Sequence, residues 1–137
     1  MKSTSIAASA ARLAAMTIFM VPPVLAHHSS AGFSQDVKEI SGTVKEFQFR
    51  NPHSWIQLNV TDASGKVTEW SVEWGSPNQL GREGIRPSTF SPGMNVTIKM
   101  RPMMNGTPVG GFVGAKMPDG KTIGKWDTGD GKKPAYE

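Results

Sequence analysis

The sequence predicts an all-β fold, a small OB-like Greek-key barrel of about five strands with one short helix between strands three and four. From residue 40 onward, short runs rich in β-branched and aromatic residues alternate apolar and polar side chains, which is typical of half-buried strands. Turn signals made of glycine, proline, asparagine or aspartate separate the runs. An open sandwich or a roll built from the same strands is the alternative architecture.

The first two strands are expected on either side of the segment Asn51–Ile56. Strand one covers residues 40–49, and Gly42 together with the irregular spacing of the apolar residues indicates a bend or bulge. Strand two covers residues 53–61, where apolar and polar residues alternate before an aspartate- and glycine-containing turn. His53 is therefore expected at a strand entrance, from which its side chain can face a cleft.

The third strand places its tryptophans and its carboxylates on opposite faces. Trp70 and Trp74 alternate with Glu69 and Glu73, and successive side chains of a strand point to opposite sides of the sheet. We expect the tryptophans to lie in or beside one core, which Trp55 shares, and the carboxylates to face mostly water.

A short helix and two further strands complete the predicted domain. Ser76, a following proline and a glutamine three residues on form a capping box, and Gly84 is placed to end the helix. Strand four alternates over residues 95–101, and strand five follows an Asn-Gly turn over residues 109–117. Because strand five is rich in glycine and lacks large side chains, its backbone can approach a ligand or a partner strand; a loose edge that tolerates sequence change is the other interpretation.

Residues 1–26 have the three parts of a secretory signal peptide. Lys2 and Arg12 provide a basic start, and the apolar residues 13–21 are far fewer than the roughly 18 residues of a membrane span. Val24–Ala26 supplies the small-residue cleavage pattern. A soluble protein with a disordered, alanine-rich start is the alternative interpretation.

The remaining chain is predicted to form a single domain, residues 27–126, followed by a tail at residues 127–137. The tail is rich in glycine, aspartate, lysine and proline, so we expect it to be disordered. The chain contains no cysteine, which excludes disulfides, and we find no second apolar span. We therefore expect a monomeric bacterial protein, periplasmic or secreted, that does not span the membrane.

Several segments resemble a known family. The predicted mature start His27–Ser29, the segment Asn51–Ile56 and the Gly75–Asn78 step resemble a family of small exported bacterial proteins known only as a domain of unknown function. The likeness covers residues 27–121 and implies a small periplasmic β-barrel with no assigned activity. The chain departs from the family's pattern between Ser30 and Phe33 and in strand five.

The sequence lacks motifs for catalysis and for nucleic-acid binding. No serine lies in a nucleophile-elbow motif, and there is no cysteine to supply a thiolate, so we expect no enzymatic activity. The formal net charge of +4 falls by two without Lys2 and Arg12, which leaves little attraction for phosphates. Aromatic residues at strand spacing are most often core, and we therefore expect no nucleic-acid partner.

These exclusions favour a non-enzymatic binding or interaction module for an unidentified small ligand or protein partner. Copper(II) binding is the alternative function, with copper as the candidate cofactor. Cleavage before His27 creates a free α-amine beside its imidazole, and with His53 these nitrogens can form the tetragonal set that copper(II) favours. His28 is a competing ligand. A solvated chain start and a histidine that only caps strand two are the other interpretation of the same residues.

Overall fold

Six strands and one helix are present in residues 32–126, the part of the chain that the computed structural model describes. They are, in chain order, β1 (Lys38–Gln48), β2 (Trp55–Thr61), β3 (Val67–Glu73), α1 (Pro77–Arg82), β4 (Asn95–Pro102), β5 (Val109–Lys116) and β6 (Thr122–Gly124). The predicted signal peptide, the predicted start of the domain at residue 27 and the predicted tail at residues 127–137 lie outside the described residues.

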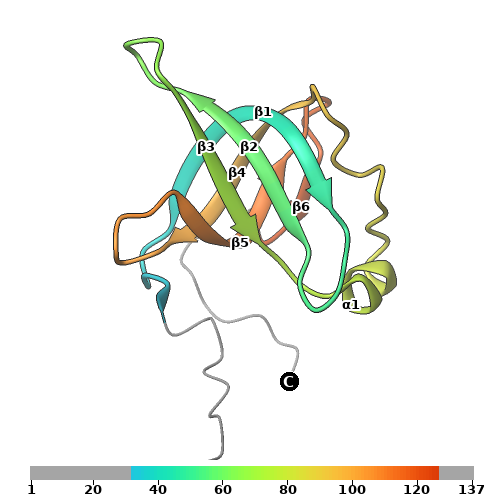
Figure 1. Cartoon of the computed structure of the whole chain (residues 1–137). Coiled ribbons are helices and arrows are strands. Elements are labelled where there is room, and N and C mark those ends of the chain that lie inside the picture. The colour runs from blue at the N-terminus through green and yellow to red at the C-terminus, as the bar shows by residue number, and fades with distance from the viewer. Residues whose placement is uncertain (1–31, 127–137) are drawn as a thin grey trace, which may run out of the picture.

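Five strands close into a barrel (Figure 1). The sheet order is β3-β2-β1-β4-β5-β6, and β3 also pairs with β5. Neighbouring strands are antiparallel except at this seam, where Ser71–Glu73 lie parallel to Val109–Gly111. The short β6 adds a hairpin to the second half of β5. The predicted five-stranded OB-like barrel, with its helix between strands three and four, is confirmed.

The first strand serves two neighbours because it bends. β1 pairs with β4 along its first half and with β2 along its second half, and its register against β2 shifts between Val44 and Glu46. This is the predicted bulge. At Gly42 the strands approach so closely that a Cβ atom would overlap the carbonyl oxygen of Asn59, so only glycine fits there.

The helix is short and capped as predicted. The Ser76 hydroxyl accepts a hydrogen bond from the backbone amide of Gln79 at 3.4 Å, and a proline occupies the first turn. Gly84 follows the helix with a φ of 83°, a conformation that favours glycine. Leu80 is fully buried, and α1 lies beside the β1–β2 connection at one end of the barrel (Figure 1).

The core lies inside the barrel and draws on every strand of the ring. Its buried members are Ile40, Val44, Ile56, Leu58, Val72, Phe90, Val96, Ile98, Met100 and Ala115. Trp70 on β3 and Trp74 directly after β3 pack against this core, as predicted. The expectation that Trp55 shares this core is wrong, because Trp55 alternates with the buried Ile56 and therefore lies half-buried on the outer face of β2.

The two carboxylates of β3 have different environments. Glu69 is exposed and forms an ion pair with Lys45, with 2.6 Å between carboxylate oxygen and Nζ. The expectation that both carboxylates face water is wrong for Glu73, which is 9% exposed. Its cross-strand neighbours are Trp55 on β2 and Gly111 on β5, and these strands enclose the carboxylate on the outer face.

The turn between β2 and β3 is held by Asp62. Its Oδ1 accepts hydrogen bonds from the Ser64 hydroxyl at 2.6 Å and from the Lys66 amide at 3.0 Å. These bonds, the Ser64 bond first, lower the pKa of Asp62 below its ordinary value of 3.8. Because folding lowers this pKa, the ionised carboxylate stabilises the turn above the ordinary pKa, and this contribution is lost as the pH falls through the lowered value.

Replacement of Trp70 by alanine tests the assignment of the β3 faces. Because Trp70 is only partly buried against the core, we expect Trp70→Ala to lower the free energy of unfolding by about 2–3 kcal/mol, less than a fully buried tryptophan would cost. Val67 lies on the other face and is 57% exposed, so Val67→Ala should change stability by less than about 0.5 kcal/mol. Urea denaturation of both variants measures the difference, and equal midpoints would contradict the assignment.

Two glycine-to-alanine changes should have opposite effects on stability. Gly42→Ala forces a methyl group onto the Asn59 carbonyl, and we expect a loss of about 1–3 kcal/mol. Gly81 lies within α1 with its nearest neighbouring atom 3.9 Å from the Cβ position, so Gly81→Ala should stabilise the helix by up to about 1 kcal/mol. Thermal unfolding of the two variants measures both shifts; a stable Gly42→Ala protein would show that the β1–β2 approach is not close.

Candidate functional site

The backbone around His53 is fixed to the end of β3. The Ser54 amide donates to the Gly75 carbonyl at 3.0 Å, and the Trp74 amide donates to the Ser54 carbonyl at 2.8 Å. These bonds continue the β2–β3 pairing beyond the end of β2. His53 is thereby held at the entrance of β2, where the sequence places it.

His53 contacts a buried carboxylate. Its Nδ1 lies against Oε1 of Glu73, and the histidine side chain is 46% exposed. In a neutral imidazole whose Nδ1 donates to a carboxylate, Nε2 carries the free lone pair and can accept a proton or bind a metal. The contact therefore orients one ring nitrogen of His53 toward other partners.

Glu73 belongs to a row of residues that crosses the outer face of the barrel. Trp55 pairs with Glu73, Glu73 pairs with Gly111, and Gly111 pairs with Arg101. A side chain at Gly111 would come within 3.2 Å of the Phe33 ring. The space left by the missing side chain of Gly111 in strand five is thus filled by Phe33 of the same chain. At this position Phe33, and not a ligand or partner strand, approaches the backbone.

The start of the described chain lies along the end of β4. Phe33 forms an isolated bridge with Met103, the Ser34 amide donates to Pro102 at 2.8 Å, and the Met104 amide donates to Gly32 at 3.0 Å. The described chain therefore begins next to Arg101 and its row.

The predicted metal ligands are divided between described and undescribed residues. His27 and His28 lie outside the described residues, whereas His53 lies within them. Residues 32–126 contain no group of three or more histidine, cysteine, aspartate or glutamate side chains that could hold a metal ion. His53 and Glu73 are a pair, and a metal bound by His53 needs further donors from elsewhere.

Ser54, His53 and Glu73 are the residue types of a hydrolytic triad, but their arrangement does not suit catalysis. Ser54 is fully buried and alternates with His53 along the strand direction, so the two side chains point to opposite sides. Its Oγ has no hydrogen-bond partner among the described residues. A nucleophile must reach a substrate and hydrogen-bond its base, and Ser54 does neither.

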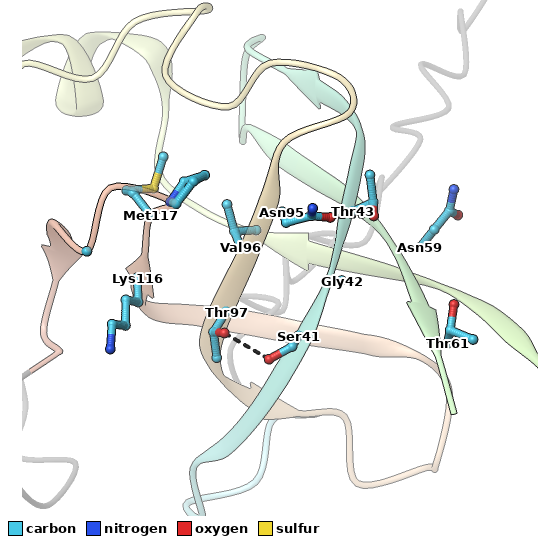
Figure 2. Close-up of a pocket in the computed structure, with 12 residues that line it drawn as sticks. Ser41, Gly42, Thr43, Asn59, Thr61, Asn95, Val96, Thr97, Lys116 and Met117 are labelled. Atoms are coloured by element: carbon cyan, nitrogen blue, oxygen red, sulfur yellow. Dashed lines mark hydrogen bonds between the residues drawn. The ribbon is translucent and has the colours of Figure 1, made fainter. Parts of the chain in front are cut away.

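A second feature, the polar trough, is a hollow of about 540 Å³ on the outer face at the far end of β2 (Figure 2). Its uncharged polar side chains are Ser41, Thr43, Asn59, Thr61, Asn95 and Thr97, and Lys116 also lines it. The Ser41 and Thr97 hydroxyls are 2.8 Å apart, and Thr43 Oγ1 donates to Asn95 Oδ1 at 2.8 Å. Sequence reasoning missed the trough. The one signal for it in the sequence was the polar residues that alternate with the apolar ones in each strand. These residues do not show which positions of neighbouring strands lie side by side.

The fold and the site define a small β-barrel domain in which a histidine at the rim, His53, contacts the buried carboxylate of Glu73. The chain belongs to the DUF6152 family, a family of unknown function, whose model matches residues 16–112. This confirms the resemblance found in the sequence. No curated protein and no solved structure matches the chain. Within the described residues, no helix has the length and hydrophobicity that a membrane crossing requires.

The role of the Ser54 hydroxyl can be tested by its removal. Because this buried hydroxyl has no partner in the described part of the chain, Ser54→Ala should leave the free energy of unfolding unchanged or raise it by about 1 kcal/mol. Ser71 is the matched control, since its hydroxyl donates to Gln57 at 2.6 Å, and Ser71→Ala should cost about 1 kcal/mol. Denaturant titrations compare the two; a large loss in Ser54→Ala would reveal a buried partner for the hydroxyl.

Proposed function

We propose that this chain is an exported, non-enzymatic binding module whose binding group is the imidazole of His53 at the rim of the barrel. The observation that supports this proposal is the contact between Nδ1 of His53 and the buried Glu73 carboxylate. A buried carboxylate is retained where it has a partner, and this one orients a half-exposed ring nitrogen for a ligand. The signal-peptide pattern of residues 1–26 supports export.

Copper(II) is the ligand that the same geometry favours. Metal-binding histidines commonly donate the N–H of their second ring nitrogen to a carboxylate, which fixes the tautomer and the orientation of the ring. Glu73 is placed to do this for His53. Export with cleavage after Ala26 would add the α-amine and imidazole of His27, with His28 as a competing ligand, and nitrogen donors of this kind suit copper(II).

The chain path is compatible with a site shared between the mature start and His53. His27 precedes Gly32 by five residues, which span at most roughly 18 Å when extended. The Gly32 carbonyl accepts a hydrogen bond from the amide of Met104, two residues beyond β4. Arg101 on β4 pairs with Gly111, which in turn pairs with Glu73. The described chain therefore starts on the side of the barrel that carries Glu73, and the extended span from Gly32 back to His27 sets how far a shared site can lie.

Copper titration of the exported protein tests both parts of the proposal, that His53 is the binding group and that copper(II) is its ligand. Intact-mass measurement first establishes that the purified chain starts at His27. We expect His53→Ala and an extra residue before His27 each to weaken copper(II) binding, because each removes a donor of the shared site. Glu73→Gln should weaken it by about 10- to 100-fold, the usual effect of removing the group that orients a metal ligand.

The control for Glu73 is Glu69→Gln. Glu69 lies on the same face of β3 but is paired with Lys45, so its replacement should leave copper affinity unchanged. Equal and tight binding by the processed protein, by His53→Ala and by the extended chain would rule out the shared site. If the processed protein binds no copper, copper(II) is rejected as the ligand, and the binding module at His53 has a different ligand.

A further inference from the structure

The polar trough lies far from His53 on the barrel surface. Asn59 follows His53 by six residues along β2, which corresponds to about 20 Å at the rise of an extended strand. The trough therefore forms a separate site, and a ligand bound there is independent of the proposed function at His53. We propose that the polar trough binds a neutral saccharide unit through the side chains of Thr43, Asn59 and Asn95.

Charge complementarity indicates an uncharged ligand. None of the residues that line the trough is acidic, and Lys116 is their one cation. Figure 2 shows the Lys116 side chain at the edge of the trough, directed away from Thr43 and Asn95. A phosphate or a carboxylate ligand is bound most strongly by cationic donors aimed at it, and the interior of the trough offers neutral groups instead.

The hydrogen-bonding groups of the trough are both donors and acceptors. Thr43 donates its hydroxyl proton to Asn95 Oδ1, so the Asn95 amide nitrogen keeps both of its protons for a ligand. Asn59 is half-buried and makes no side-chain hydrogen bond to the described residues, so its amide offers two donors and one acceptor. Sugar hydroxyl groups also donate and accept, which makes them complementary to such a mixed surface.

The apolar lining and the volume of the trough narrow the class of ligand further. Pro118 and the partly buried Met117 supply apolar surface beside the polar groups, against which the C–H face of a sugar ring can pack. No aromatic side chain lines the trough, so a nucleobase would find no stacking platform. A volume of about 540 Å³ lies within the roughly 300–1,000 Å³ of small-molecule sites, although those sites are mostly apolar and this one is mostly polar.

The site is organised before a ligand arrives. Thr43 lies between its cross-strand neighbours Asn59 on β2 and Asn95 on β4. Barrel pairing thus holds three side chains in one row, and the Thr43–Asn95 bond fixes two of them. Groups that are already held in place lose less conformational entropy when a ligand binds.

Titration of ¹⁵N-labelled protein with triacetylchitotriose, a neutral sugar with hydroxyl and amide groups, tests this inference. We expect saturable shifts of the Asn59 and Asn95 side-chain amide signals, and unchanged signals in the Asp62–Gly65 turn. Asn59→Leu and Asn95→Leu should each weaken binding by about tenfold, the effect of about one lost hydrogen bond. Asn78→Leu, an exposed asparagine on α1, should bind the sugar as the parent protein does.

Three results would overturn the inference. The first is the lack of any saturable shift at millimolar sugar. The second is parental affinity in Asn95→Leu, an exposed position whose folding the amide spectrum itself reports. The third is displacement of the sugar by millimolar inorganic phosphate, which would assign the trough to anions attracted by Lys116.

Discussion

The parallel pairing between β3 and β5 is the contact on which the rest of the molecule depends. It joins only Ser71–Glu73 to Val109–Gly111, yet it turns an open sheet into a ring whose inner side is the core. Two of its residues are glycines whose missing side chains leave room for other parts of the chain: a Cβ atom at Gly110 would overlap the Met100 sulfur and one at Gly111 would crowd the Phe33 ring. Without this seam, the apolar faces of β3 and β5 would lie at two free edges.

The same seam creates the environment of Glu73. The carboxylate lies on the outer face between Trp55 and Gly111, where closure removes it from water although it does not point into the core. A carboxylate in such a position is costly unless a polar group satisfies it. The contact with His53 provides that group. The strand pairing that closes the barrel therefore also positions the carboxylate that orients the His53 ring. The binding role that we propose for His53 follows from a feature needed for folding.

The two candidate regions use the barrel in different ways. His53 is presented by a connection that is fastened to the end of β3 by two backbone bonds, so the histidine is held at a rim. The polar trough instead lies across strands, and its geometry depends on the bulge that lets β1 pair with both β2 and β4. The ring thereby presents two chemically distinct surfaces, one with a half-exposed imidazole and one with neutral hydroxyl and amide groups.

Local patterns in the sequence predicted the elements of the fold and one member of the site. Strand alternation located the strands and the core face of Trp70 and Trp74, and the Ser76 capping box located the helix. These features depend on neighbours within a few residues, so the sequence displays them directly. His53 at a strand entrance was predicted in the same way, because the Asn-Pro step before it and the alternation after it are local.

What only the tertiary structure decided is which distant residues meet. Glu73 looks like a surface carboxylate in the sequence, since it alternates with Trp74 as Glu69 does with Trp70, and only the β3–β5 seam distinguishes the two. Thr43 and Asn95 bond across 52 residues, and His53 and Glu73 meet across 20. The sequence by itself determined periodicity, turns and caps, because these are properties of short segments. Strand register and ring closure determined the sites, because pairing between remote strands leaves no periodic mark in either strand.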